Sequence, residues 1–247
     1  MRYFLEVSYK GTKYAGFQIQ QNATTIQGEV ERALAIVFRT PLALTGSSRT
    51  DAGVHAQQNF FHFDTDIFFP PKAIYNLNAL LPLDIVIKSV FPVPADAHCR
   101  FLAQSRRYKY YITAAKDPFL TDTAWYYPYS LDVGLLQQAA QILFRHHDYT
   151  SFSKRNTQVF THQCTIVESE WTTENNRLVY TVKANRFLRG MVRGLVGTML
   201  LVGRKKITLH DFENIILAKD CTRANFATPS HGLFLVNVEY PGSIQGE

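Results

Sequence analysis

The sequence predicts an α+β protein made of two consecutive β-α-β-β-α-β units. Three observations predict this fold class: segments in which apolar and polar residues alternate, segments with apolar residues three or four positions apart, and a proline-rich break between two such series. The break is Pro92-Val93-Pro94-Ala95-Asp96. It divides the 247 residues into an expected first domain, 1–104, and an expected second domain, 105–247, each long enough to bury its own core.

The first domain is expected to contain four strands and two helices. Alternation from residue 2 to residue 10 predicts the first strand. An apolar stripe that begins at Ile26, within a capping box at Thr24-Thr25-Ile26-Gln27, predicts a helix that ends near Arg39. The other expected elements are strands at 41–44 and 59–63, a helix that Pro70-Pro71 opens and that runs through residue 80, and a strand at 85–91.

The second domain is expected to repeat this order with one additional helix. Its expected elements are a strand at 106–113, a helix at 132–145, a hairpin of 164–171 and 178–184, helices at 187–202 and 209–218, and a strand at 233–240. The repeated order is that of the ferredoxin-like, or RNP-like, fold. Two such units side by side are expected to form a central mixed, mostly antiparallel sheet, with a catalytic cleft between them.

The composition is that of a globular protein with an anionic partner. Hydrophobic residues make up 46% of the chain and charged residues 19%, and the net charge is +6. Basic residues interleaved with aromatic ones suit phosphate contacts and base stacking. They form four clusters: Arg100 with Arg106, Arg107 and Lys109; Lys154 with Arg155; Arg186 with Arg189 and Arg193; and Arg204 with Lys205 and Lys206. For each cluster alone, a solvated surface is the alternative.

The sequence shows no pattern of a membrane span, a signal peptide or a metal site. Its longest apolar run is far too short for a bilayer, so a cytoplasmic protein is expected. Cys99, Cys164 and Cys221 are far apart and lack C-x-x-C spacing, so they are expected to be packing residues. His146-His147-Asp148 also lacks ligand spacing. We expect neither a metal nor a cofactor.

A polar loop with two glycines lies between the two strands expected in the middle of the first domain. It reads Gly46-Ser47-Ser48-Arg49-Thr50-Asp51-Ala52-Gly53-Val54-His55-Ala56. A carboxylate that a rigid sheet displays among hydrogen-bond donors is typical of a catalytic site. The alternative is an Asx-turn, in which the Asp51 side chain bonds only to its own backbone.

The expected helix 187–202 carries Arg193 beside Gly190 and Gly197. Because glycine within a helix costs about 1 kcal/mol relative to alanine, the spacing indicates that another backbone approaches this face. We expect the Asp51 loop to lie there, with a bidentate salt bridge between Arg193 and Asp51. Close packing of some other segment, with Arg193 exposed, is equally compatible with the spacing.

The loop from Gly46 to Ala56 resembles the active-site motif of the TruA family of tRNA pseudouridine synthases, G-x-G-R-T-D-A-G-V-H-A. Other stretches are similar to the same family. Residues 185–197 resemble the pattern A-N-x-F-L-x-x-M-V-R-x-[IL]-V-G. Residues 105–110 resemble R-x-Y-x-Y, and residues 226–233 resemble A-x-P-x-x-G-L. Residues 14–20, near the start, are also similar to the family. The resemblance therefore runs from the first expected strand to the last.

This resemblance implies an isomerase that converts uridine to pseudouridine at positions 38, 39 and 40 of the tRNA anticodon stem-loop, and that works as a homodimer. It implies that Asp51 is the nucleophile, that Arg193 pairs with Asp51, and that Tyr108 contacts the target uracil. An ionised carboxylate needs no activating base. Attack at ribose C1′ and attack at uracil C6 both remain open.

The resemblance also implies residues that bind the RNA. Arg49 is expected to fill the space that the target base leaves, and Leu233 to line the base pocket. Arg106 and Arg107, from the first basic cluster, are expected to bind substrate.

The sequence departs from the family pattern at four positions. Ser47 and Ser48 stand where alanine and glycine are usual, Cys99 stands where alanine is frequent, and Arg145 stands where glycine is common. None of these positions is that of Asp51, Tyr108 or Arg193. We therefore expect the departures to affect the positioning of RNA rather than the reaction.

Two other functions are compatible with parts of the sequence. A non-catalytic RNA-binding module of the RNA-recognition type has the same element order, but its RNP1 string is absent from this sequence. An Asp-dependent phosphohydrolase requires a cluster of carboxylates, and none accompanies Asp51 in the sequence.

Overall fold

The computed structural model describes residues 1–70, 72–155 and 159–244, and it has an α+β fold. The chain forms two compact units, each with its own strands and helices. Unit 1 consists of Met1–Gln104 and the segment that begins at Phe234, and unit 2 consists of Ser105–Leu233. Across the described ranges, every helix is too short or too polar to cross a bilayer.

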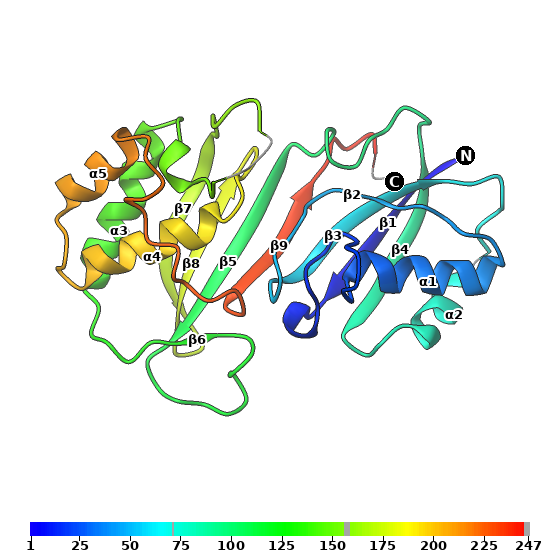
Figure 1. Ribbon diagram of the computed structural model, residues 1–247, viewed down its shortest axis with the longest axis horizontal. Coiled ribbons are helices and arrows are strands. Elements are labelled where there is room, and N and C mark those ends of the chain that lie inside the picture. Colours follow the sequence, from blue (N-terminus) through cyan, green and yellow to red (C-terminus); the bar gives the residue numbers. More distant parts are fainter. Residues whose placement is uncertain (71, 156–158, 245–247) are drawn as a thin grey trace. The chain divides into compact units, whose positions relative to one another are not determined.

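Unit 1 has three long strands in the order β4-β1-β3, with β1 antiparallel to both neighbours. On β3, the short β2 pairs in the antiparallel sense and β9 in the parallel sense. Figure 1 shows α1 and α2 side by side across these strands. The bounds are β1 Arg2–Tyr9, η1 Gly11–Lys13, α1 Ile26–Phe38, β2 Thr45–Gly46, β3 His55–Asp64, α2 Ala73–Leu80, β4 Ile85–Val93 and β9 Leu233–Glu239.

The core of unit 1 is rich in aromatic side chains. Phe17 stacks on Phe61 with ring centroids 4.4 Å apart, and both side chains are buried. Tyr240, from the end of the chain, meets Phe4 and Phe60 at centroid distances of 5.3 and 5.1 Å. A residue that follows β9 therefore completes a core that the first strand begins.

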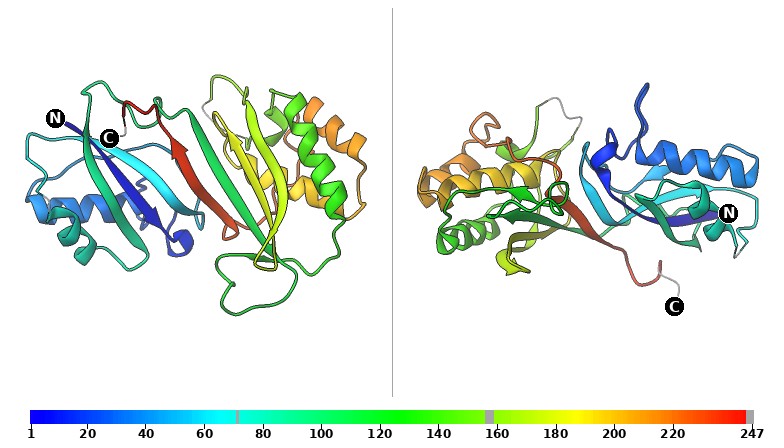
Figure 2. Two further views of the ribbon diagram at one scale, coloured as in Figure 1. Left: turned by 180° about the vertical axis from the view of Figure 1, so that it is seen from behind. Right: turned by 90° about the horizontal axis from the view of Figure 1, so that it is seen from below.

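Unit 2 has the strand order β5-β8-β7, antiparallel throughout, with the short β6 parallel to β5. Figure 2 shows α3, α4 and α5 gathered on one side of these strands. Asn175 and Asn176, at φ 49° and 60°, close the β7–β8 hairpin, since this turn requires two left-handed residues. The bounds are β5 Ser105–Thr113, β6 Trp125–Tyr126, α3 Val133–Ile142, η2 Leu143–Arg145, η3 Thr150–Phe152, β7 Ile166–Glu174, β8 Arg177–Ala184, α4 Met191–Gly203 and α5 Leu209–Leu217.

Several element boundaries differ from the sequence-based expectation. The N-cap of α1 is Thr25 rather than Thr24, because the Thr25 hydroxyl accepts the Gly28 N–H. The helix expected at 187–202 begins only at Met191, since Gly190 adopts a left-handed φ of 73°. Residues 41–44, expected as a strand, form none; the strand before the Asp51 loop is β2, which covers only Thr45–Gly46. Pro71, expected to help open α2, lies outside the described residues.

The last strand also differs in its grouping. The sequence-based division assigns everything after residue 104 to the second domain, whereas the contacts of β9 group it with unit 1. The reason is a parallel pairing with β3, in which His55 is opposite Phe234 and Ala56 is opposite Leu235. Such a pairing joins distant parts of the chain, and no local pattern encodes it.

Candidate active site

The Asp51 loop leaves β2 at Gly46 and enters β3 at His55. The loop contains a turn in which the Val54 N–H donates to the Asp51 carbonyl oxygen at 3.2 Å. Gly53 takes a left-handed φ of 76° in this turn, a conformation that favours glycine. Asp51 is half-buried and Arg49 is exposed.

The segment from Tyr9 to Phe17 supports this loop from one side. Thr50 shares a hydrogen bond of 2.7 Å between its hydroxyl and that of Tyr9, and its carbonyl accepts the Phe17 N–H at 3.1 Å. A Cβ on Gly11 would overlap the Val54 carbonyl oxygen, and one on Gly16 would lie 3.0 Å from the Thr50 oxygen. Only glycine therefore allows this segment to approach the loop so closely.

Strand β3 holds the other side of the loop. Asn59 donates from Nδ2 to the Ser48 carbonyl at 2.8 Å, and the Ser47 N–H donates to the Phe60 carbonyl at 2.8 Å. His55 is buried, accepts the Gly11 N–H at 3.0 Å and stacks on Phe234. These contacts fix the backbone on both sides of Asp51, which is what a positioned catalytic group requires.

Tyr108 lies on β5 in unit 2, where it meets Phe187 edge to face. Their ring centroids are 5.0 Å apart with an interplanar angle of 81°, and both side chains are half-buried. Arg106, two positions earlier on the strand, donates from Nη1 to the Asn185 carbonyl at 3.1 Å. Because side chains alternate along a strand, Arg106 and Tyr108 point to the same face of β5.

Arg107 points to the opposite face of β5 by the same alternation. Its Nε and Nη2 atoms both lie 2.8 Å from Oε2 of Glu168. Lys109 follows the same rule and pairs with Glu174 at 2.7 Å. The structure therefore separates Arg107 from Tyr108, and an acidic side chain offsets its charge.

Arg193 is the third residue of α4, and the segment 225–228 holds it. Its Nε donates to the Thr228 carbonyl at 2.6 Å, and the Thr228 hydroxyl donates back to the Arg193 carbonyl at 2.9 Å. A Cβ on Gly197 would overlap the Asn225 carbonyl oxygen. The close approach that the glycines predict is real, and within unit 2 the segment 225–228 makes it.

The segment that follows Thr228 lies along β5. Tyr110 donates from its hydroxyl to the Pro229 carbonyl at 2.7 Å, and the Tyr111 N–H donates to the Gly232 carbonyl at 2.9 Å. Burial raises the pKa of Tyr110, and the nearby charge of Arg193 lowers it in part. Leu233, at the end of this segment, is buried.

The site residues predicted from the sequence therefore fall into two groups. Arg49 and Asp51 share one loop of unit 1, while Arg106, Tyr108, Arg193 and Leu233 belong to unit 2, with Arg107 on the other face of β5. The ion pair between Asp51 and Arg193 joins the two groups and stays a prediction. Sequence reasoning missed the supporting residues Tyr9, Gly16, Asn59 and Thr228. Glycine at 11 and 16 was a local signal for the support of the Asp51 loop, and Gly197 was one for the Thr228 segment.

Comparisons with known proteins agree on one family. A family model described as tRNA pseudouridine synthase matches residues 6–102 and 139–241. The chain is 46% identical to a tRNA pseudouridine synthase A of Parabacteroides distasonis over 246 residues, with 97% of this chain and 96% of that protein covered. Proteins of the same name from Porphyromonas gingivalis and Staphylococcus aureus are 43% and 35% identical. The alignment with the Porphyromonas gingivalis protein covers 98% of both chains. The alignment with the Staphylococcus aureus protein covers 96% of this chain and 90% of that protein.

Proposed function

The chain belongs to the tRNA pseudouridine synthase family, and from this premise we propose that it modifies uridines 38, 39 and 40 of the anticodon stem-loop with Asp51 as nucleophile. Pseudouridine synthases are isomerases, so the chain is an isomerase that forms pseudouridine in tRNA. The family membership confirms the resemblance seen in the sequence motifs. The two alternative functions, an RNA-binding module and a phosphohydrolase, are not those of this family.

The proposed reaction exchanges one bond for another. The bond between N1 of uracil and C1′ of ribose breaks, the base turns, and a bond between C5 and C1′ forms. N1 gains a proton and C5 loses one, so there is no redox change and no net uptake of water. The Asp51 carboxylate would add to C1′ or to C6 and leave again when the new bond forms.

The support of the Asp51 loop is the observation that carries this assignment. Thr50 is held on both sides, by the Tyr9 hydroxyl and by the Phe17 N–H, and Val54 closes the turn on the other side of Asp51. A nucleophile gains much of its effect from being held in place before the reaction. A surface Asx-turn would have no need of such support.

Unit 2 would supply the groups that act on the base. Tyr108, with Phe187 against its edge, would contact the target uracil, and Leu233 would line the pocket. Arg193 would keep Asp51 ionised and aim it. Its hydrogen bonds with Thr228 support this role, because they restrict a long side chain to one direction.

The remaining arginines would contact RNA. Arg49 is exposed beside Asp51, as a residue that enters the RNA stack must be. Arg106 shares a strand face with Tyr108, so we assign it to substrate binding near the base. Arg107, which pairs with Glu168 on the other face, would bind only RNA that reaches that face.

We extend the proposal to architecture and assembly. The antiparallel order β4-β1-β3-β2 within unit 1 supports a ferredoxin-like domain that carries the Asp51 loop, and unit 2 would be a second such domain. We further propose a cytoplasmic homodimer that binds tRNA across both subunits, with the active cleft between the two domains. Light scattering of the purified protein tests the dimer directly.

The decisive experiment uses tRNA from a strain that lacks this activity. Wild-type protein is expected to form pseudouridine at positions 38 to 40, and Asp51→Ala is expected to form none while it still binds tRNA. Asp66→Ala, which removes a fully exposed carboxylate of the same unit, is the matched control and is expected to be active. Equal product from the Asp51 variant would contradict the nucleophile assignment. Binding without product from wild-type protein would favour a binding module.

A further inference from the structure

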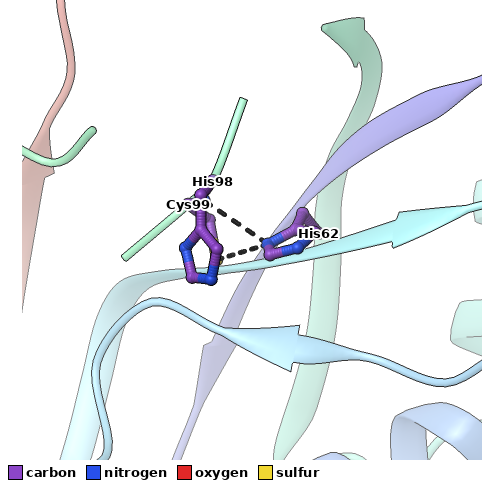
Figure 3. Close-up of side chains that lie close together, drawn as sticks. All are labelled: His62, His98 and Cys99. Atoms are coloured by element: carbon purple, nitrogen blue, oxygen red, sulfur yellow. Dashed lines mark hydrogen bonds between the residues drawn. The ribbon is translucent and has the colours of Figure 1, made fainter. Parts of the chain in front are cut away.

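His62, His98 and Cys99 come together in unit 1, as Figure 3 shows. His62 lies on β3, whereas His98 and Cys99 follow β4. One candidate ligand atom of each side chain lies within 4.8 Å of those of the other two. Cys99 is fully buried, His62 is 6% exposed and His98 is half-buried.

The Nδ1 atoms of both histidines take part in hydrogen bonds. Nδ1 of His62 lies 3.1 Å from the Cys99 Sγ and accepts the Cys99 N–H at 3.4 Å. Nδ1 of His98 accepts the Arg100 N–H at 3.2 Å. The Cys99 thiol lies 3.1 Å from the Thr45 carbonyl oxygen, to which it donates. The thiol is a weak hydrogen-bond donor and acceptor, so a metal ion could replace its hydrogen bonds.

We propose that His62, His98 and Cys99 bind one Zn²⁺ ion. Two imidazoles and one thiolate are ligands that zinc prefers. A tetrahedral zinc site places such ligand atoms about 3.3–3.6 Å apart. The His62–Cys99 pair is already close to this spacing. The half-buried His98 ring would move toward the pair to complete the three ligands, and its partial exposure leaves a fourth position for water.

The positive charge around the cluster means that Zn²⁺ binding would depend on the negative charge of the Cys99 thiolate. Arg2 lies beside the cluster, since its Nη1 donates to the Ala97 carbonyl at 3.0 Å, and Arg100 directly follows Cys99 in the chain. Asp64 offsets Arg2 through two hydrogen bonds of 2.8 and 2.7 Å. On binding, the thiol gives its proton to solvent, so the ion and thiolate together add a single positive charge. Without the thiolate, the ion would add two positive charges beside the arginines, so Cys99 is indispensable to the site.

The bound ion would stabilise the base of the Asp51 loop. The Cys99 carbonyl accepts hydrogen bonds from Ser47 Oγ at 2.9 Å and from the Tyr240 hydroxyl at 2.6 Å. Ser47 is the first residue after β2. A metal on Cys99 and His62 would therefore tie the loop, β3 and the segment after β4 together. This is a structural role, and it does not depend on the reaction proposed for Asp51.

The test measures metal binding by the purified full chain after treatment with a chelator. One Zn²⁺ per chain is expected by titration calorimetry, together with a rise in Tm, because an ion that binds only the folded state stabilises it. Co²⁺ is expected to give a thiolate charge-transfer band in the near ultraviolet. No stoichiometric binding, or binding without that band, would overturn the proposal.

Variants identify the ligands. Cys99→Ala is expected to abolish the band and the Tm rise, and His98→Ala to weaken Zn²⁺ binding about tenfold or more. The half-buried His98 position keeps the test available if the substitution of the fully buried Cys99 prevents folding. Cys221→Ala and His210→Ala, both in unit 2, are matched controls that keep the band. An unchanged band in both ligand variants would show that this cluster is not the site.

Discussion

Arg193 and Thr228 hold each other through two hydrogen bonds that run in opposite directions. Arg193 donates from its side chain to the Thr228 backbone at 2.6 Å, and Thr228 donates from its side chain to the Arg193 backbone at 2.9 Å. The pair therefore fixes both the start of α4 and the direction of the guanidinium. Lysine could retain the positive charge but not this geometry.

We predict that Arg193→Lys lowers the single-turnover rate of pseudouridine formation by about a hundredfold, because an ammonium group cannot form the fork-shaped contact of a guanidinium. Binding of tRNA should change little. Rapid-quench measurement on a single tRNA checks the rate. Arg189→Lys, at an exposed position just before α4, is the control and should keep the wild-type rate. If both variants react at the wild-type rate, Arg193 does not aim the nucleophile.

Gly16→Ala should weaken the support of the Asp51 loop. Position 16 has a φ of 112°, and the added methyl would lie 3.0 Å from the Thr50 oxygen. Strain of this kind costs about 1–3 kcal/mol, so we expect a lower free energy of unfolding and slower product formation. Urea unfolding and single-turnover kinetics check both effects. Gly242→Ala, where no atom lies within 4 Å of the new methyl, should change neither.

Tyr108→Phe should separate binding from chemistry. The ring and its edge-to-face contact with Phe187 remain, so tRNA affinity should hold, while loss of the hydroxyl should slow product formation about tenfold or more. Phe187→Ala removes a contact worth about 0.5–1.5 kcal/mol and should slow the reaction less. Tyr126→Phe, at an exposed position on β6, serves as the control. An unaltered rate in Tyr108→Phe removes this hydroxyl from the reaction.

The basic hollow beside η3 should contribute to tRNA affinity. Lys154, Arg155 and Lys219 line it together with Thr150 and Ser153. If Lys154 and Arg155 each neutralise one phosphate, the double change to glutamate should weaken tRNA binding and reduce the slope of log K against log salt by about 2. Filter binding at several salt concentrations measures the slope. A slope equal to that of the wild type means that both side chains face solvent in the complex.

The capping box of α5 makes stability depend on pH. The Thr208 backbone N–H and then its hydroxyl donate to Asp211 and lower the pKa of that carboxyl. The ionised form is therefore favoured in the folded state. Its contribution is fully present above the pKa of an aspartate in the unfolded chain, and it is lost as pH falls through the lower folded value.

Asp211→Asn should accordingly unfold at a lower urea concentration than the wild type at pH 7, and the difference should shrink in acid. Urea unfolding at a series of pH values measures it. Asp96→Asn, at an exposed position outside any helix cap, should match the wild type at every pH. A difference that stays constant down to the most acidic pH at which the protein folds would contradict an ionised cap.

The sequence predicts the elements of this fold well where the signal is local. Alternation of apolar residues marks β1, and the stripe that starts at Ile26 marks α1, since both patterns come from short-range geometry. The start of α4 was misplaced by four residues, from 187 to 191, because a left-handed Gly190 ends the preceding segment. The pairing of β9 with β3 was not predictable, because it depends on contacts far apart in the chain.

The candidate site shows the same division. The motif around Asp51 identified the family, which the comparisons confirm. The contacts that support the loop involve Tyr9 and Asn59, and no local sequence pattern around these residues predicts that role. The predicted contact between Asp51 and Arg193 links two units and stays a prediction.

The grouping of β9 with unit 1 has a consequence for biosynthesis. When the first hundred residues leave the ribosome, Phe234, which lies opposite His55 in the parallel pairing, has not yet been made. Tyr240, whose ring contacts Phe4, has not been made either. The amino-terminal half must therefore wait for the whole of unit 2 before its core can close. For the same reason, a fragment cut at residue 104 lacks part of its own interior.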